Sequence, residues 1–300
     1  KELNGNAQPI ITFADYMIAE SLEDTELDEF ADDPAEWMNR HWDIINEQFY
    51  DSENYLYNHS TIDSKKYMED QFIVAIAGFL IGRTNDIWLE DTAYGNLKTN
   101  ANQTATNLTQ QMLEATINDG AWSTYDAFIH SRTSDNTDSF DDSLYLSTNA
   151  YGIWALCEKY INSGTKDNLA LERAESAFNT INSSLWNETY SLYMNKLDDT
   201  GLLIQDNNID LKNNALMMNA LKRLFEITGN WTYFDTLSKM VDSIYNFMRD
   251  PVYGNYYNAI IDYGGGDPKT STTFDTNKDF GSHAYLFRSY FKIVELNQFL

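Results

Sequence analysis

A link rich in aromatic residues recurs four times along this chain, and its spacing limits what the chain can fold into. The four copies are FYDSENYLYNHS, INDGAWSTYDAFIH, LWNETYSLYMNKL and MRDPVYGNYYNAI, each with a turn residue between aromatic flanks. If Asp51, Asp119, Asn187 and Asp250 are equivalent, the copies are 68, 68 and 63 residues apart. A period of this length indicates an array of similar helical hairpins. The turn between aromatic flanks also favours a short β-hairpin in each link.

Two kinds of helical segment alternate with these links. One kind carries a narrow apolar stripe, as in ANQTATNLTQQMLEATIND, NLALERAESAFNTI and WTYFDTLSKMVDSIYNFM. That pattern is typical of a helix with one face in water, whereas a helix that is apolar nearly all round is enclosed by the protein. The enclosed helices are predicted at Tyr67–Gly82, Asn149–Ile161, Leu211–Ile227 and Phe280–Leu296.

The alternation predicts an all-α fold, a double-layered α/α barrel with the enclosed helices inside and the amphipathic ones outside. The N-terminal stretch fits the same scheme, with an inner helix near Ile10–Ser21 and an outer helix near Pro34–Gln48. Short turns such as ITGN, in which Gly229 supplies a left-handed cap, link inner to outer helices. We therefore expect five inner and four outer helices in a single domain over residues 1–300.

The arrangement resembles the six-hairpin (α/α)6 toroid proteins. The resemblance lies in LWNETYSLYMNKLDDTG, NNALMMNALKRLFEITGNWTYFDTLSKMVDSIYNFM and YMEDQFIVAIAGFL, and it extends from about Pro34 to the end. These segments are similar to hairpins of N-acylglucosamine 2-epimerase-like proteins, of the family 76 glycoside hydrolases (endo-α-1,6-mannanases) and of the helical domain of a thioredoxin-domain-containing family. A complete toroid has twelve helices, which at this period needs about 400 residues. We therefore expect an open ring, a ring completed outside these 300 residues, or one that the first segment closes differently.

Composition narrows the class of partner. The formal net charge is −26, so nucleic acid and anionic membranes are unfavourable partners. The longest apolar run, Phe72–Gly82, is too short to span a bilayer, so no transmembrane segment is expected. Aromatic residues make up 14% of the chain, which suits a large core and also a surface that stacks on sugar rings.

Asparagine sequons favour a secreted or cell-surface protein. N-x-S/T sequons are glycosylation acceptors in secreted proteins, and all those in this chain fall in predicted loops or on polar helix faces. The single cysteine, Cys157, forms no disulfide framework and so does not report the redox compartment. The sequon asparagines are Asn58, Asn102, Asn107, Asn182, Asn187 and Asn230.

Acidic residues collect at the predicted starts of the inner helices, which is the long-link end of the barrel. Glu69 and Asp70 begin one inner helix and Asp141 and Asp142 the next, while Asp206 with Asp210 and Asp275 with Asp279 precede the other two. Paired carboxyl groups in an aromatic cleft are what glycoside hydrolysis requires. Helix capping and the helix dipole place acids at the same positions without any catalysis.

The resemblance singles out Asp141 and Asp142 as the candidate catalytic pair. The mannanase family has an adjacent Asp pair at the start of an inner helix, and FDDSLYL matches it, with Phe140 where the family usually has Trp or Tyr. Glu69 and Asp70 are the reserve pair. The epimerase-like family relies on paired histidines, and only His283 lies on a predicted inner helix, so epimerase chemistry is the less favoured activity.

Three aromatic residues and one histidine are the candidate substrate-binding residues. Trp122, Tyr151 and Trp154 are expected to stack on sugar rings, and His283 is expected to line the same cavity. No cofactor is expected to be required. The loop DNTDSFDD offers Asp135 and Asp138 as weak candidate ligands for Ca²⁺, although the EF-hand pattern is absent.

The sequence therefore predicts an extracytoplasmic toroid that binds or cleaves carbohydrate, with a glycoside hydrolase as the expected enzyme class. The alternative is a non-catalytic, glycosylated cell-surface module for binding or assembly in an envelope or filament. The pattern leaves the oligomeric state open.

Overall fold

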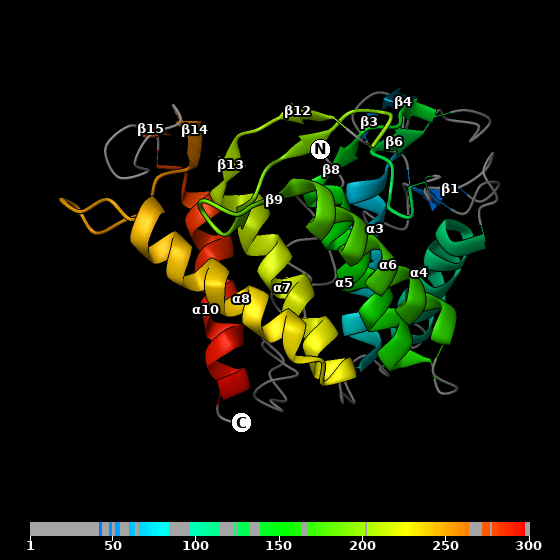
Figure 1. Cartoon of the computed structure of the whole chain (residues 1–300). Helices are drawn as coiled ribbons and strands as arrows, with labels where there is room; N and C mark the ends of the chain where they lie inside the picture. Colours follow the sequence, from blue (N-terminus) through cyan, green and yellow to red (C-terminus); the bar gives the residue numbers. More distant parts are fainter. Residues whose placement is uncertain are drawn as a thin grey trace. The chain divides into compact units, whose positions relative to one another are not determined.

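The computed structural model describes residues 42–43, 48–49, 52–54, 60–63, 66–83, 97–114, 123, 125–132, 139–163, 167–201, 203–263, 272–276 and 278–297. The chain forms two compact units. The first comprises Lys1–Thr124, Phe128–Asp142 and Glu158–Arg173, and the second comprises Tyr125–Ala127, Ser143–Cys157 and Ala174–Leu300. Helices α5 (Leu146–Asn162) and α6 (Asn168–Leu185) contribute residues to both units. Figure 1 shows the elements in chain order.

In the first unit, α3 (Met68–Arg83) packs against α4 (Leu97–Glu114). Every residue of α3 from Phe72 to Ile81 is buried, as predicted for an enclosed helix. The two helices touch at Gly78, where a Cβ atom would lie only 2.6 Å from the backbone oxygen of Ala101. A glycine is therefore required at this contact, because a backbone atom cannot move aside as a flexible side chain can.

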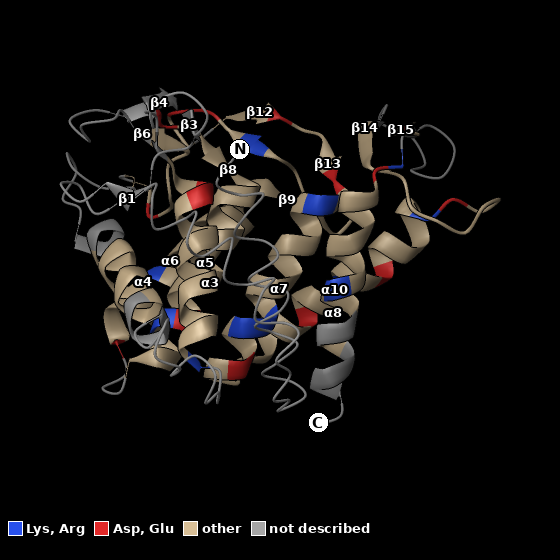
Figure 2. Cartoon of the chain, turned by 180° about the vertical axis from the view of Figure 1, so that it is seen from behind, with Lys and Arg blue, Asp and Glu red and all other residues tan. Residues whose placement is uncertain are grey.

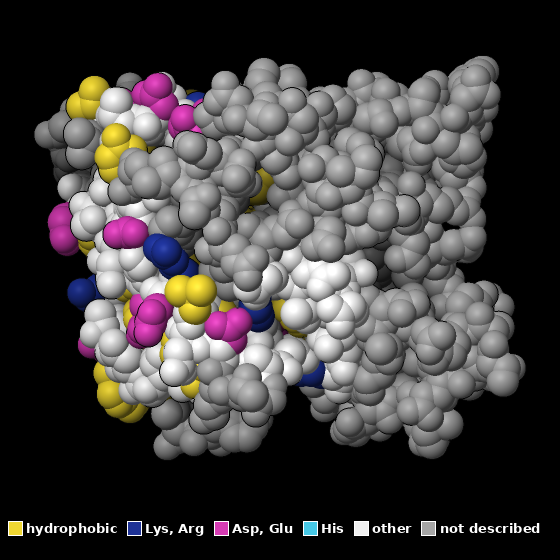
Figure 3. All heavy atoms as spheres, turned by 90° about the vertical axis from the view of Figure 1, so that its right-hand side faces the viewer, with side chains coloured by type: hydrophobic (Ala, Val, Ile, Leu, Met, Phe, Trp, Pro, Cys, Tyr) yellow, Lys and Arg dark blue, Asp and Glu magenta, His cyan; other side chains and the backbone are white. Residues whose placement is uncertain are grey.

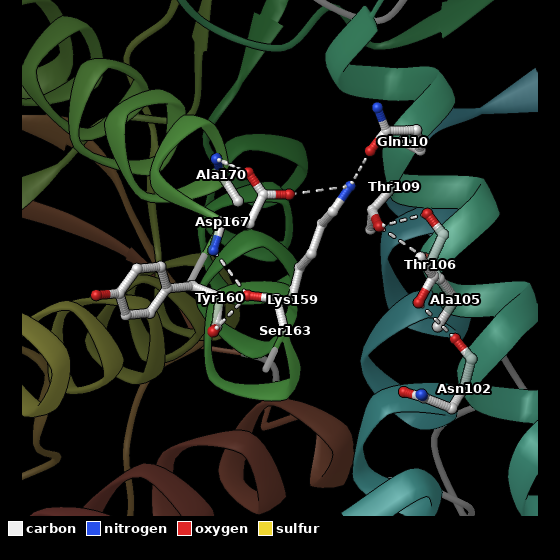
Figure 4. Close-up of polar contacts among 10 residues, drawn as sticks. All are labelled: Asn102, Ala105, Thr106, Thr109, Gln110, Lys159, Tyr160, Ser163, Asp167 and Ala170. Atoms are coloured by element: carbon white, nitrogen blue, oxygen red, sulfur yellow. Dashed lines mark hydrogen bonds and ion pairs between the residues drawn. The ribbon is translucent and has the colours of Figure 1, made fainter. Parts of the chain in front are cut away.

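Polar side chains join α5 to α4 within the first unit (Figure 4). Lys159 is buried, and its Nζ donates to Gln110 Oε1 at 2.7 Å and lies 3.6 Å from Asp167 Oδ2. One residue earlier, the fully buried Glu158 forms an ion pair with Arg83 of α3. A buried charge is tolerated when it has such partners, so these two pairs account for charged residues on a helix that is otherwise apolar.

In the second unit, α7 (Leu211–Thr228) packs against both α8 (Trp231–Ser243) and α10 (Phe280–Asn297). The Ser289 hydroxyl donates to the backbone oxygen of Ala215 at 2.8 Å, which ties α10 to α7. Helix α7 ends at Gly229, whose φ of 66° confirms the predicted left-handed cap. A π-helical turn, η2 (Ile244–Met248), continues α8.

Short strands lie where the inner helices begin (Figure 1). Three antiparallel pairs are β1 (Trp42–Asp43) with β2 (Gln48–Phe49), β3 (Ser52–Asn54) with β4 (Ser60–Asp63), and β9 (Trp186–Asn187) with β10 (Leu192–Tyr193). Three sheets have three strands each: β5 (Lys66–Tyr67), β6 (Ser131–Arg132) and β7 (Ser139–Asp141); β8 (Leu144–Tyr145), β11 (Lys196–Leu197) and β12 (Ile204–Asp206); β13 (Ile209–Asp210), β14 (Ala259–Tyr263) and β15 (Thr272–Asp275).

The three-stranded sheets repeat one design. The first strand immediately precedes an inner helix, the middle strand comes from the following link, and the third strand ends in an aspartate. In each sheet one residue of the middle strand pairs with a residue on either side, and paired residues of antiparallel strands lie on the same face. The three rows are Tyr67–Ser131–Asp141, Tyr145–Lys196–Asp206 and Asp210–Ala259–Asp275.

The first amide of each of these inner helices is satisfied by the following link. An α-helix leaves its first N–H groups without partners inside the helix. Here the N–H of Met68 donates to His130 O at 2.9 Å, and the corresponding amides of α5 and α7 donate to Asn195 O and Asn258 O at 2.9 and 2.7 Å. Each repeat therefore completes the helix start of the one before it.

The fourth residue of an inner helix holds the hairpin that precedes that helix. Tyr193 N–H donates to Asn214 Oδ1 at 2.8 Å, and Tyr256 N–H donates to His283 Nε2 at 3.1 Å. The same side chains also bond the carbonyl four residues back, Asn214 Nδ2 to Asp210 O at 2.9 Å and His283 Nδ1 to Asp279 O at 2.7 Å. Asn149, fourth in α5, makes the same backward bond to a carbonyl at 2.9 Å.

Two residues aligned from the sequence as repeat equivalents make identical turns. Asn187 Oδ1 accepts from Thr189 N and Tyr190 N, and Asp250 Oδ1 accepts from the amides two and three residues on. This confirms their equivalence, since both side chains form the same Asx turn. The equivalent Asp51 and Asp119 lie outside the described residues, as does the predicted helix near Ile10–Ser21.

Two helix predictions are wrong in part. The outer helix expected at Pro34–Gln48 is contradicted where the structure describes it, because Trp42–Asp43 and Gln48–Phe49 form antiparallel strands. Aromatic residues at paired strand positions favour such a hairpin over a helix. The second correction concerns α10, which was expected to be enclosed on all sides. Phe280 and Phe287 are exposed, so one face of α10 is bare among the described elements.

Candidate functional site

Two carboxyl groups meet one amide in the second unit, where α7 begins. Asn195 Nδ2 donates to Asp210 Oδ2 at 2.6 Å and to Asp206 Oδ2 at 3.3 Å, so the two oxygens are at most about 6 Å apart. Asn213 Nδ2 donates to Asp210 Oδ2 at 3.3 Å, and its own head is oriented by Asn195 Oδ1. Figure 2 shows acidic segments of the chain in red at β12 and β13, the strands that end in Asp206 and Asp210.

The surroundings raise the pKa of Asp210. Burial is the largest cause, because it disfavours the charged form. The negative charges of Asp206 and Asp275 act in the same direction, while the hydrogen bond from Asn195 and the charge of Lys212 oppose them. Asp210 is thus a carboxyl group that holds its proton to higher pH than an ordinary aspartate.

Asp210 occupies the N-cap position of α7 without acting as a cap. Its side chain makes no capping hydrogen bond and turns instead towards Asn195 and Asn213. Asp279 stands at the same position before α10, and there Oδ2 accepts from Ser282 N at 2.8 Å and from Ser282 Oγ at 3.0 Å. Capping, the alternative explanation for these acids, therefore accounts for Asp279 and does not account for Asp210.

Aromatic and cationic side chains of three inner helices contact one another in the second unit. Lys212 Nζ lies over the ring of Tyr285 at 5.3 Å, and the Tyr285 hydroxyl lies 3.0 Å from that of Tyr151. One turn further along α10, the Arg288 guanidinium stacks over Trp154 at 4.9 Å. Tyr151 is fully buried and Trp154 is 3% exposed, so in this conformation both rings pack against protein and offer no face for sugar stacking.

His283 is fixed as one tautomer by its two hydrogen bonds. An amide N–H can only donate, so Nε2, which accepts from Tyr256 N, carries no proton. The proton is therefore on Nδ1, which donates to Asp279 O. His283 therefore orients the backbone at Tyr256 and Asp279. Its contact with substrate stays a prediction.

A short strand separates the pair singled out by the resemblance from its helix. Asp141 ends β7 and Asp142 follows it, but α5 begins only at Leu146, because Leu144–Tyr145 form a strand first. The backbone oxygen of Asp141 accepts from His130 N at 3.1 Å, as those of Asp206 and Asp275 accept from Asn195 N and Asn258 N. Asp141 therefore belongs to a position that the repeat fills with aspartate three times.

The reserve pair lies where the sequence predicted. Glu69 and Asp70 are in the first turn of α3, and Asp70 is buried. Trp122, Asp135 and Asp138 lie outside the described residues. Among the residues that the structure does describe, no group of three or more His, Cys, Asp or Glu side chains is arranged to hold a metal ion.

The sequon asparagines differ in accessibility. Asn230 is exposed and caps α8 through Oδ1, which accepts from Thr232 N at 3.0 Å and leaves Nδ2 for a glycan. Asn182 accepts from the Tyr193 hydroxyl, Asn187 forms its hairpin turn, and Asn102 and Asn107 lie on α4. Asn58 is outside the described residues.

The described surface carries mixed charge. On the face drawn in Figure 3, acidic, basic and apolar side chains of the described residues are interspersed. Within the described part of the chain, no helix is long and apolar enough to cross a membrane.

Sequence reasoning noticed Asp206 and Asp210 as acids near a helix start but missed the amide that they share. One signal is Asn195 itself. It is equivalent to Asn258 in the next repeat, but the side chain of Asn258 accepts from Asp279 N and does not bind two carboxyl groups. A second signal is the row position of Asp210, where two other repeats have Tyr67 and Tyr145. Asp210 thus departs from the residue type of the repeat. The departure becomes visible only when the strand register aligns Asp210 with Tyr67 and Tyr145.

Solved structures show which fold this is. The structure of a sugar epimerase from a ruminal bacterium superposes on this chain with a TM-score of 0.71 and 12% sequence identity. The match covers 97% of this chain and 71% of the epimerase chain. A family 76 glycoside hydrolase (mannosidase) from Bacteroides thetaiotaomicron matches 99% and 72%, with a TM-score of 0.67 and 11% identity. A D-mannose isomerase matches 99% and 87%, with a TM-score of 0.57 and 13% identity.

These likenesses confirm the predicted α/α toroid fold, with short β-hairpins in its links, and the resemblance to epimerase-like and family 76 toroids. At such low identity they show the fold alone. No known family model matches the sequence, and no curated protein sequence matches it either.

Proposed function

We propose that this protein is a carbohydrate-active toroid of the glycoside hydrolase type, with Asp210 as its proton donor and Asp206 as the second carboxyl group. The observation that carries the proposal is the shared amide of Asn195, which holds the two carboxyl groups together while burial raises the pKa of one of them. Pairs of acids whose surroundings separate their pKa values are the usual acid and base of glycoside cleavage.

The chemistry follows from these two environments. Asp210, which keeps its proton to higher pH, donates it to the glycosidic oxygen as the bond to the leaving sugar breaks. Asp206 activates a water molecule or attacks the anomeric carbon from the other side. Asn195 and Asn213 hold the Asp210 carboxyl in one orientation, so that its proton faces a fixed direction.

The structures to which this chain is similar support carbohydrate as the substrate class. Their names describe a sugar epimerase, a mannosidase and a mannose isomerase, all on the same fold. Hydrolysis is favoured over epimerisation here because two carboxyl groups converge, whereas His283 uses both ring nitrogens for backbone contacts. Asp141 and Asp142 remain a separate prediction, which the same experiment tests.

The test is a turnover assay on an oligosaccharide panel that includes α-mannans. We expect Asp210→Asn and Asp206→Asn each to lower kcat by about 100-fold or more, since general acid–base groups contribute about 10²–10⁴. The matched control is Asp199→Asn, an exposed aspartate in the turn before β12. A double Asp141→Asn/Asp142→Asn variant tests the other pair, and circular dichroism checks that each variant folds.

The outcomes separate the alternatives. Wild-type activity should also fall as pH rises through the pKa of Asp210, because the proton donor is then lost. The Asp210→Asn variant should not show this fall. Full activity in both Asp210→Asn and Asp206→Asn would remove this site from the mechanism. If the wild-type protein turns over nothing yet retains oligosaccharides in a binding assay, the non-catalytic binding or assembly module is the better description.

An extracytoplasmic location is part of the proposal. It rests on the sequons, of which Asn230 is the best placed because its Nδ2 is accessible on an exposed helix cap. N-glycosidase treatment of the natively produced protein should remove more mass from the wild-type chain than from an Asn230→Gln variant, and the difference should equal the mass of the glycan at Asn230. An unchanged mass for the wild-type chain would remove the support that this residue gives.

A further inference from the structure

Two successive repeats of the second unit can be compared residue by residue. The hairpin turns at Asn187 and Asp250 are equivalent, and so are the fourth residues of α7 and α10, Asn214 and His283. Counting from these anchors, Tyr190 corresponds to Tyr253, Leu211 to Phe280 and Met218 to Phe287.

These three positions have opposite environments in the two repeats. Tyr190, Leu211 and Met218 are at most 1% exposed. Their counterparts Tyr253, Phe280 and Phe287 are 78%, 86% and 52% exposed. The earlier repeat is covered by the element that follows it, since Phe247 of η2 packs edge-on against Tyr190 with ring centroids 5.4 Å apart. The later repeat has equally large apolar side chains with no described element over them.

The exposed face contains both projections and a hollow. An open pocket of about 690 Å³ lies among these rings, with Tyr245, Tyr253, Phe280 and Phe287 in its walls. An isologous interface requires a surface that is complementary to itself, and exposed rings around a hollow supply both shapes that such a surface needs. We call Tyr245, Val252, Tyr253, Phe280 and Phe287 the α10 face.

The size of the α10 face fits a dimer. Its five side chains are 52–86% exposed, and an aromatic side chain buries about 150–250 Å², so the face offers about 600 Å² of apolar surface. Monomers rarely leave more than a few hundred Å² of contiguous apolar surface in water, and a stable interface buries about 800 Å² per partner. Exposed Arg249 and Asp279 at its edge provide charges of both signs for a rim.

We propose that the α10 face binds a second copy of this chain, each copy covering the other as η2 covers the preceding repeat. The dimer goes beyond the proposed carbohydrate activity and does not depend on it. Arg249 and Lys278 hold two rings of the face in position. Arg249 stacks on Tyr245, and Lys278 lies 4.8 Å from the centre of the Tyr253 ring while it bonds Asp250.

The experiment is sedimentation velocity of the 300-residue chain from about 1 to about 50 µM, a range that reports a micromolar Kd. We expect a concentration-dependent dimer whose Kd rises at least tenfold in Phe280→Asp and stays within about twofold in Phe280→Leu. The matched control is Leu203→Asp, which places the same charge on a leucine that is 66% exposed outside the face.

Two results would overturn the proposal. The first is a chain that stays monomeric over the whole concentration range, because the α10 face would then not mediate self-association. A dimer that Phe280→Asp leaves intact, or that Leu203→Asp weakens equally, is held together elsewhere. Thermal unfolding of each variant shows that a lost dimer is not a lost fold.

Discussion

At the scale of single residues, Asp210 shows how one substitution in a repeat can create a chemical group. Two other repeats have a tyrosine at this row position, Tyr67 and Tyr145. Aspartate at the same point brings a buried carboxyl next to Asp206, and Asn195 binds both. The group costs stability when charged, which is the usual signature of a functional position.

The raised pKa of Asp210 predicts how stability depends on pH. The folded protein holds this proton more tightly than the unfolded chain does. Its contribution is therefore fully present below the ordinary aspartate pKa of about 4 and is lost as pH rises through the folded-state pKa. Asp210→Asn has no such proton, so we expect its unfolding free energy to improve relative to wild type as pH rises above about 4.

Urea unfolding at a series of pH values measures this difference. Asp199→Asn, exposed and outside the cluster, serves as the control and should show a flat difference. A difference that moves in the opposite direction would mean that the folded protein favours the charged form of Asp210.

At the scale of elements, one polar residue near the start of an inner helix holds the preceding hairpin. Asn214 does so with an amide and His283 with an imidazole, and each both accepts from the hairpin and donates back along its helix. The requirement is for one acceptor and one donor in the right directions, which either side chain meets.

This equivalence predicts which substitutions His283 tolerates. His283→Asn should keep the hairpin in place at a cost below about 1 kcal/mol, because the neighbouring repeat performs the same task with asparagine. His283→Leu has similar bulk and no polar atom, so it leaves the Tyr256 amide unpaired and should cost about 1–3 kcal/mol. Chemical denaturation checks both, and equal losses in the two variants would show that shape, and not hydrogen bonding, is what matters.

At the scale of the whole molecule, the repeat determines both what the sequence predicts and what it hides. The helices were predictable because apolar residues at helical spacing report burial directly, as in α3 and α7. The three-stranded sheets were not, since two-residue strands such as Lys196–Leu197 leave no alternation to detect. Asn195, Asp206 and Asp210 lie in one link, but their meeting depends on the shifted register of β11 against β12, which no local pattern gives.

The net charge gives a prediction at the same scale. With a formal charge of −26, folding brings many like charges together, and salt screens that repulsion. Raising NaCl from about 10 mM to about 500 mM, which shortens the screening length severalfold, should therefore raise the Tm by several degrees. The rise should shrink at about pH 4.5, where some carboxylates are protonated. A Tm that falls with salt would show that attractive pairs such as Arg83–Glu158 dominate instead.

The bonds from each helix start to the following link also bear on how the chain is made. Met68 N, Leu146 N and Leu211 N all depend on a carbonyl that lies later in the sequence, at His130, Asn195 and Asn258. During synthesis an inner helix thus leaves the ribosome before the residue that completes it exists. The first amide of each inner helix therefore lacks its partner until the next link has been synthesised. A translational stall between repeats would leave that amide unpaired until synthesis resumes.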